Sequence, residues 1–235
     1  MIYTPLLHRA FHFAITIHEV EQKQKRKGKD VAYVTHPIQV GLILAKAGAP
    51  EHVIAAGFLH DTTEDSIEEA KVTKEELEAE FGSQVADLVA SVSEKNRALS
   101  WQDRKETAME EIRHFSHDSL LLKSGDVISN TTELLSDFER DGNATFKRFN
   151  APKAQLIEHA QEVIATIISA WPENPLADDL QNCHDGLEDM KPDMKVTYVE
   201  SEIDPETKQR MIATALAPIF EAAERTYREQ QNTSE

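Results

Sequence analysis

Apolar residues recur at the spacing of an α-helix along most of this chain, from about residue 5 to residue 170. Only 8 glycines and 9 prolines interrupt the 235 residues, so long stretches lack the residues that most often end a helix. Thr73-Lys74-Glu75-Glu76 is a capping box, a pattern typical of a helix start. Alternation of apolar and polar residues is confined to one short segment, so the sequence predicts an all-α fold.

The expected helices lie one after another, and a change of composition separates them from the end of the chain. They are predicted at about residues 5–24, 36–48, 50–60, 73–81, 83–92, 102–114, 118–138 and 152–170. After Trp171-Pro172 comes an acidic, poorly patterned stretch, then a short predicted strand over 195–203 and a helix that begins at Asp204-Pro205. We therefore expect a helical domain of residues 1–172 and a small C-terminal extension of residues 173–235.

Charge and composition narrow the classes of partner. The chain carries 25 Lys+Arg against 42 Asp+Glu, a formal net charge of −17, which argues against nucleic acid as its main partner. No window approaches twenty apolar residues, so no membrane span is expected. The start lacks the pattern of a secretion signal and Cys183 is the single cysteine, which together predict a cytoplasmic protein. The sequence does not set the oligomeric state, and a homo-oligomer is one option.

The segment His60-Asp61-Thr62-Thr63-Glu64-Asp65 is the most informative for chemistry. It places four ionisable side chains directly after the apolar run 55–59. On a helix these side chains would crowd one edge, and three carboxylates so close repel each other unless a cation lies among them. Imidazole with carboxylate is a ligand set for Mn, Fe or Zn. The alternative is an exposed acidic helix end, and an isolated His-Asp pair does not decide between the two.

Two further positions favour a metal site. His36 precedes Pro37 where a loop meets a helix, so its side chain can reach a shared cleft. Asp126 lies among apolar and small neighbours, with Asn130 one turn further on the same face. A buried Asp beside an Asn needs a hydrogen-bonded network or a metal.

The ordered set His36, His60-Asp61 and Asp126 resembles the H…HD…D pattern of HD-domain metal-dependent phosphohydrolases, whose fold is a helical bundle. The surrounding segments resemble the small alarmone hydrolases, relatives of the RelA/SpoT hydrolase domain, over roughly residues 5 to 170. The matching segments are Arg26 to Pro37, His60 to Asp65, Phe81 to Val89 and Lys123 to Leu134. The resemblance implies hydrolysis of the 3′-pyrophosphate of guanosine tetra- or pentaphosphate, giving GDP or GTP and pyrophosphate.

The resemblance also implies a role for each matching residue. As ligands of one divalent ion, usually Mn(II), it implies His36, His60, Asp61 and Asp126. The catalytic acidic pair, which positions and activates the attacking water, would be Glu64 and Asp65. Contacts to a nucleotide substrate would come from Arg26 on the purine, Lys27 on phosphate, Asn130 on the sugar and Tyr33 in the same pocket.

Departures from the family pattern leave alternatives open. Val127 and Ser129 stand where the family often has a basic residue and a histidine, which leaves the choice of nucleotide open between guanosine and adenosine alarmones or another phosphoester. A nucleotide-binding regulator without turnover is a further alternative. The basic run 23–29 predicts a positive entrance for an anionic substrate, although such runs are also common as solvated loops.

Overall fold

The computed structural model describes residues 3–63, 72–94 and 101–191, and their backbone is almost entirely helical. Within these ranges no β-strand forms, and extended pairing is limited to an isolated antiparallel bridge between Lys25 and Ala32. The predicted all-α class is therefore confirmed. The α-helices are α1 Pro5–Ile15, α2 Thr35–Lys46, α3 Glu51–Leu59, α4 Lys74–Phe81, α5 Ser83–Val92, α6 Trp101–Ile112, α7 His117–Asp141, α8 Lys153–Ala170 and α9 Ala177–Asp189.

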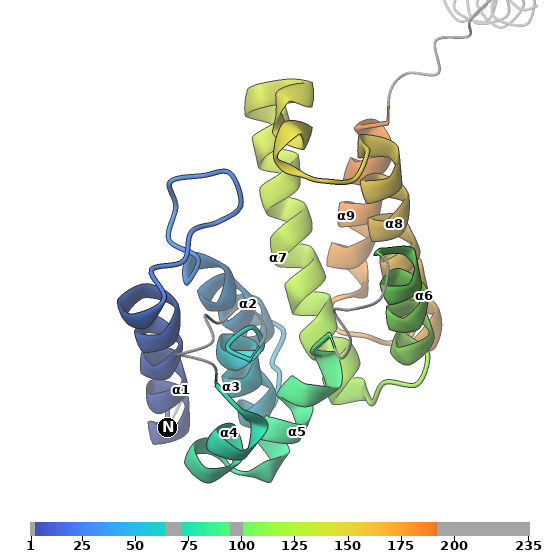
Figure 1. Cartoon of the computed structure of the whole chain (residues 1–235). Coiled ribbons are helices and arrows are strands. Elements are labelled where there is room, and N and C mark those ends of the chain that lie inside the picture. The colour runs from blue at the N-terminus through green and yellow to red at the C-terminus, as the bar shows by residue number, and fades with distance from the viewer. Residues whose placement is uncertain (1–2, 64–71, 95–100, 192–235) are drawn as a thin grey trace, which may run out of the picture. The chain divides into compact units, whose positions relative to one another are not determined.

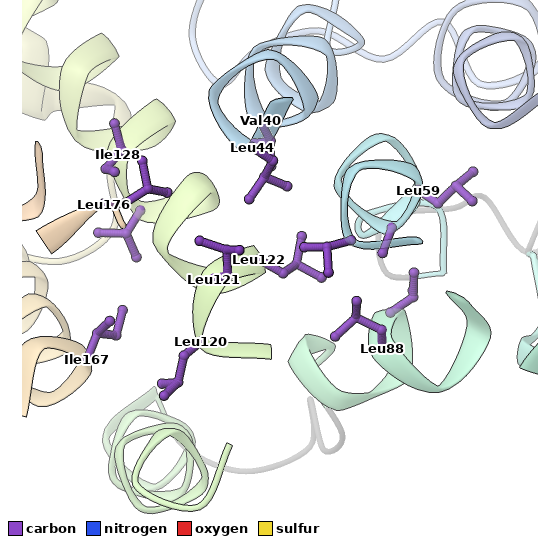
Figure 2. Packing of buried hydrophobic residues seen from close by; sticks show 14 of the residues in the cluster. Val40, Leu44, Leu59, Leu88, Leu120, Leu121, Leu122, Ile128, Ile167 and Leu176 are labelled. Atoms are coloured by element: carbon purple, nitrogen blue, oxygen red, sulfur yellow. The ribbon is translucent and has the colours of Figure 1, made fainter. Parts of the chain in front are cut away.

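Helix α7 is the longest element and runs through the middle of the fold (Figure 1). It packs against α2, α3 and α5 on one side and against α8 and α9 on the other. The side chains of the buried Leu120, Leu121 and Leu122 point in different directions, so α7 contributes to the packing on both of its sides (Figure 2). A helix apolar around much of its circumference is expected at the centre of a bundle.

The close approach of α2 and α3 depends on two glycines. A Cβ atom on Gly41 would lie 2.2 Å from the ring of Phe58, and one on Gly57 would lie 2.6 Å from a methyl group of Leu44. Both distances are far below van der Waals contact, so a larger residue at either position would force the helices apart. In this way α2, which begins beside His36, and α3, which ends beside His60, are held together.

Side-chain caps fix several helix starts. The Thr73 side chain accepts a hydrogen bond from the Glu76 backbone, and the Glu76 side chain accepts one from Thr73, so the predicted capping box is confirmed. The Ser116 hydroxyl caps α7 in a similar manner. These caps satisfy amides that a helix start leaves without intrahelical partners.

The first helix is shorter than the sequence predicts. α1 ends at Ile15 and continues as a π-helical turn over Thr16–Glu21, after which the chain enters the segment that contains the Lys25–Ala32 bridge. The Thr16 hydroxyl donates to the His12 carbonyl oxygen at 3.0 Å, a bond that competes with regular helical pairing. The predicted helix over 5–24 is therefore correct only in its first part.

The compact unit extends to Lys191, beyond residue 172 where the sequence analysis places the end of the helical domain. α9 accounts for the difference, since it packs on α7 and α8 and buries Leu180, Cys183 and Leu187. The predicted strand over 195–203 and the helix from Asp204 lie outside the described residues. None of the helices in the described ranges is both long enough and apolar enough to span a membrane.

Candidate active site

Two imidazoles and two carboxylates from three distant segments meet beside α7. His36 lies in the first turn of α2, His60 and Asp61 directly follow α3, and Asp126 lies midway along α7. His36 Nε2 is 3.3 Å from Asp126 Oδ1 and 3.5 Å from Asp61 Oδ2. His60 Nε2 is 3.3 Å from Asp61 Oδ2 and 4.0 Å from Asp126 Oδ1. We call these four residues the HD cluster.

The ring of each histidine is oriented through its other nitrogen. His60 Nδ1 lies 2.9 Å from the carbonyl oxygen of Gly57, which can only accept, so Nδ1 donates and in the neutral ring Nε2 carries the lone pair. His36 Nδ1 lies 3.0 Å from Ser129 Oγ on α7. Both Nε2 atoms therefore face the carboxylates of the HD cluster, and both imidazoles are almost fully buried.

The carboxylates dominate the electrostatics of the cluster. Burial alone would lower the pKa of His60, but the charge of Asp61, with a smaller effect of Asp126, raises it to about 9. Burial would likewise raise the pKa of Asp126, yet the ammonium of Lys123 and the two imidazoles hold it well below its ordinary value. Lys123 Nζ donates to Asp126 Oδ2 at 2.8 Å. The place between the four side chains thus favours positive charge.

The donor set fits a divalent metal ion. Ligand atoms of His36, His60 and Asp126 all lie within 4.8 Å of one another, and Asp61 Oδ2 approaches both imidazoles. Among the described residues, His60 Nε2 is buried without a hydrogen-bond partner, which is costly for a polar atom unless something else binds it. A small cavity of about 70 Å³, lined by His60, Asp61, Lys123 and Asp126 among others, adjoins these atoms.

Three of the predicted substrate residues are connected to the HD cluster. The Tyr33 hydroxyl donates to Asp61 Oδ2 at 2.6 Å. Asn130 Nδ2 donates to Asp126 Oδ1 at 2.6 Å, and its carbonyl oxygen accepts from Arg26 Nη2 at 2.8 Å. The guanidinium of Arg26 also lies 5.4 Å from the centre of the Tyr33 ring. Arg26 therefore contacts both Tyr33 and Asn130, and these two residues contact Asp61 and Asp126 respectively.

Lys27 and the rest of the basic run are placed differently from what their charge suggests. The Lys27 ammonium lies 5.6 Å from the centre of the Phe149 ring, not against the HD cluster. Arg26 and Lys29 both pair with Glu133, and Lys29 also pairs with Asp137. The run is consequently less positive than its sequence predicts, because acidic residues of α7 neutralise part of it.

Glu64 and Asp65, the predicted catalytic pair, lie outside the described residues. The sequence analysis assigned no role to Lys123, Gln39 or Glu133, although each contacts a residue of the site. For Lys123 a signal existed, since residues three apart on a helix share a face and Lys123 precedes Asp126 by three. The partners of Arg26 on α7 are more than one hundred residues away in sequence, so no local pattern could indicate them.

The arrangement of the HD cluster within a helical bundle defines the class of protein. A family model described as "HD domain" matches residues 10–134, more than half of the chain, and the chain therefore belongs to the HD-domain family. Within that family its curated relatives are guanosine-3′,5′-bis(diphosphate) 3′-pyrophosphohydrolases. The MESH1 protein of Danio rerio is 34% identical over 133 residues, which cover 56% of this chain and 70% of that protein. Human MESH1 is 34% identical over 127 residues, covering 53% and 67%.

Bacterial relatives and solved structures extend these similarities. A Vibrio cholerae enzyme with the same activity name is 43% identical over 81 residues, 34% of this chain but only 11% of that longer protein. The structure of a metazoan ortholog of SpoT covers 77% of this chain and 94% of that one, with a TM-score of 0.61 at 24% identity, which supports the fold. Protein lmo0812 of Listeria monocytogenes has a TM-score of 0.57 at 30% identity, covering 63% and 96%.

Proposed function

We propose that this protein hydrolyses the 3′-pyrophosphate of guanosine 3′,5′-bis(diphosphate) and of its pentaphosphate analogue, releasing pyrophosphate and GDP or GTP. The observation that carries the proposal is the convergence of the HD cluster. His36 Nε2 lies 3.3 Å from Asp126 Oδ1, although the two residues are 90 positions apart in the sequence. The activity named for the MESH1 relatives supports the choice of substrate.

His36, His60, Asp61 and Asp126 would hold one divalent ion, and we propose Mn(II). Two nitrogen and two carboxylate donors suit this ion, and they leave an octahedral ion room for further oxygen ligands. When bound, such an ion supplies a Lewis acid for the phosphoryl group. The Gly57 carbonyl favours the tautomer of His60 whose Nε2 is able to bind a cation, and the positive charges nearby keep both carboxylates ionised at neutral pH.

Glu64 and Asp65 supply the acid–base function in this proposal. Their assignment rests on the resemblance of the segment His60 to Asp65 to the family motif. A carboxylate there would orient the attacking water and accept its proton as the oxygen–phosphorus bond forms. The bond between phosphorus and the 3′ oxygen of the ribose then breaks, the 3′ oxygen takes up a proton to become a hydroxyl, and pyrophosphate is released.

The remaining residues orient the nucleotide. Arg26 offers a planar cation for the purine, with Tyr33 against one face and Glu133 along its edge. Asn130 would contact the sugar from its position beside Asp126. Lys27 would meet phosphate only by moving away from the Phe149 ring, which its flexible side chain permits.

The test is product analysis of purified protein incubated with the guanosine tetraphosphate, with added Mn(II) and, separately, with EDTA. We expect GDP and pyrophosphate with Mn(II) and neither with EDTA. Orthophosphate as the product would contradict cleavage at the 3′ oxygen. Parallel incubations with the adenosine analogue and with p-nitrophenyl phosphate test specificity, and turnover of p-nitrophenyl phosphate alone would refute the alarmone substrate.

The Glu64→Ala variant separates catalysis from metal binding. We expect it to retain Mn(II) like the unmodified protein but to lose at least about 100-fold in turnover, the size of a typical acid–base contribution. Glu78→Ala, which removes an exposed carboxylate from α4, is the matched control and should change neither property. Loss of metal in Glu64→Ala would instead make Glu64 a ligand.

A further inference from the structure

The two histidines of the HD cluster are oriented by chemically different groups. His60 Nδ1 faces a backbone carbonyl, whereas His36 Nδ1 faces the hydroxyl of Ser129. A carbonyl oxygen only accepts hydrogen bonds, so it admits a single tautomer of His60. A hydroxyl both donates and accepts, so by itself Ser129 would allow His36 to carry its proton on either nitrogen.

Gln39 removes this ambiguity. Ser129 Oγ donates its proton to Gln39 Oε1 at 3.1 Å. A hydroxyl has one proton, so towards His36 Nδ1 the oxygen of Ser129 can then only accept. His36 must therefore carry its proton on Nδ1, which leaves the Nε2 lone pair directed at Asp61 and Asp126.

The hydrogen bonds among His36, Ser129 and Gln39 also connect α2, which supplies His36, with α7, which supplies Asp126. Gln39 lies one turn after His36 on α2, and Ser129 lies one turn after Asp126 on α7. Ser129 is 3% exposed, so water competes little for its hydrogen bonds. Gln39 is exposed and, with Ser129, lines a cavity of about 630 Å³ between α2 and α7. The connection is thus buried at Ser129 and reaches solvent at Gln39.

We propose that Gln39 and Ser129 are positioning residues that set the tautomer and orientation of His36 for metal binding. We call His36, Ser129 and Gln39 the His36 relay. The inference rests on the metal centre of the proposed function, and it goes beyond that function by assigning roles to residues that bind neither metal nor substrate. Neither residue belongs to the ligand set that the family resemblance implies.

The experiment measures Mn(II) affinity directly, by electron paramagnetic resonance of the free ion in titrations of the purified full-length protein. Ser129→Ala should weaken Mn(II) binding by about 10- to 100-fold, the usual cost of losing a group that orients a metal ligand. Ser129→Thr keeps the hydroxyl and should restore affinity to within a few-fold. Ser124→Ala is the matched control, because Ser124 is another buried serine of α7, bonded to Asn174 and the Leu120 carbonyl.

Variants of Gln39 test whether the Ser129 hydroxyl must donate its proton to residue 39. Because Gln39 is exposed, these variants should not disturb folding. Gln39→Glu retains an acceptor for the Ser129 hydroxyl and should keep Mn(II) affinity, whereas Gln39→Met removes it and should lose several-fold. Nitrogen-15 spectra of the imidazoles should place the His36 proton on Nδ1 in the unmodified protein and mix the two tautomers in Gln39→Met. A purely structural role for Gln39 would not separate these two variants.

The outcomes distinguish the relay from the metal centre. If the unmodified protein binds no Mn(II), the proposed metal centre is wrong. If it binds Mn(II) and both Ser129→Ala and Gln39→Met bind it equally well, the centre stands and the relay is wrong. Equal losses in Ser124→Ala and Ser129→Ala would also overturn the relay, because they would reflect general damage to α7.

Discussion

Two imidazoles near Lys123, the buried His60 and the partly buried His159, have pKa values shifted in opposite directions. His60, beside Asp61 and Asp126, has its pKa raised to about 9 in spite of its burial. His159 on α8 has its pKa lowered to about 4 by burial and by the ammonium groups of Lys105 and Lys123. It lines a cavity of about 720 Å³ between α6 and α8, together with Lys105 and Arg113.

The comparison shows that burial alone does not decide the charge of an imidazole here. Burial opposes the proton at both positions, but carboxylates reverse its effect at His60 and ammonium groups reinforce it at His159. The surroundings of His60 thus favour positive charge, whereas those of His159 disfavour it.

The largest expected effect is on metal affinity, when a carboxylate of the HD cluster is removed. Asp126→Ala should reduce Mn(II) affinity by more than about 100-fold, beyond the loss expected for a group that only orients a ligand, and turnover should fall with it. Metal analysis of the purified variant checks this. Asp118→Ala, also on α7 but at a half-exposed position paired with His52, is the control and should keep its metal. Equal metal content in both variants would refute Asp126 as a ligand.

An intermediate effect is expected on the pH dependence of stability. The pKa of His159 is about 4 in the folded protein and about 6.5 when unfolded, so the unfolded state takes up a proton first as pH falls. The free energy of unfolding should therefore decrease between pH 6.5 and 4. The contribution of His159 should be about 1 to 2 kcal/mol, since partial exposure screens the full shift.

Urea denaturation at pH 6.5 and pH 4.5 measures this contribution. His159→Gln cannot be protonated and should lose less stability over the interval than the unmodified protein. His184→Gln serves as the control, because it removes an imidazole from α9 outside the cavity, and its pH dependence should match that of the unmodified protein. Identical pH dependence in all three proteins would contradict the depressed pKa of His159.

The smallest expected effect is on the pKa of His159 itself. Lys105→Met removes one of the two ammonium groups that add to burial in opposing its protonation, so the pKa of His159 should rise towards its ordinary value. Proton NMR titration of the imidazole measures the change. Lys147→Met, which removes an exposed ammonium from the turn after α7, should leave it in place. No shift in Lys105→Met would show that Lys105 does not contribute to the low pKa of His159.

Most of the fold could be predicted from local patterns. The capping box at Thr73 and the glycine at position 82 indicate the ends of α4 closely, because caps depend on neighbouring residues. α9 was missed because its acidic residues obscure a helical spacing of Leu180, Cys183 and Leu187. That spacing was present in the sequence, so the miss was avoidable, whereas the π-helical turn after α1 depends on contacts that no short pattern reports.

The sequence indicated the proposed metal ligands but not the ion pairs around them. The family motif indicated His36, His60, Asp61 and Asp126, and the structure brings these four side chains within a few ångströms of one another. Their assignment as ligands stays a prediction. The ion pairing of Arg26 with Glu133 could not be foreseen, because the two residues lie 107 positions apart in the sequence. Tertiary packing alone determines such a pair.

The point at which α3 ends has a consequence for how this protein can vary in length. The carbonyl of Gly57 is able to accept from His60 because it belongs to the last turn, where backbone acceptors lack amide partners. Inserting or deleting one residue within Glu51–Leu59 would rotate the imidazole by about 100° around the helix axis. The length of this nine-residue stretch should therefore be fixed by the position that His60 must occupy.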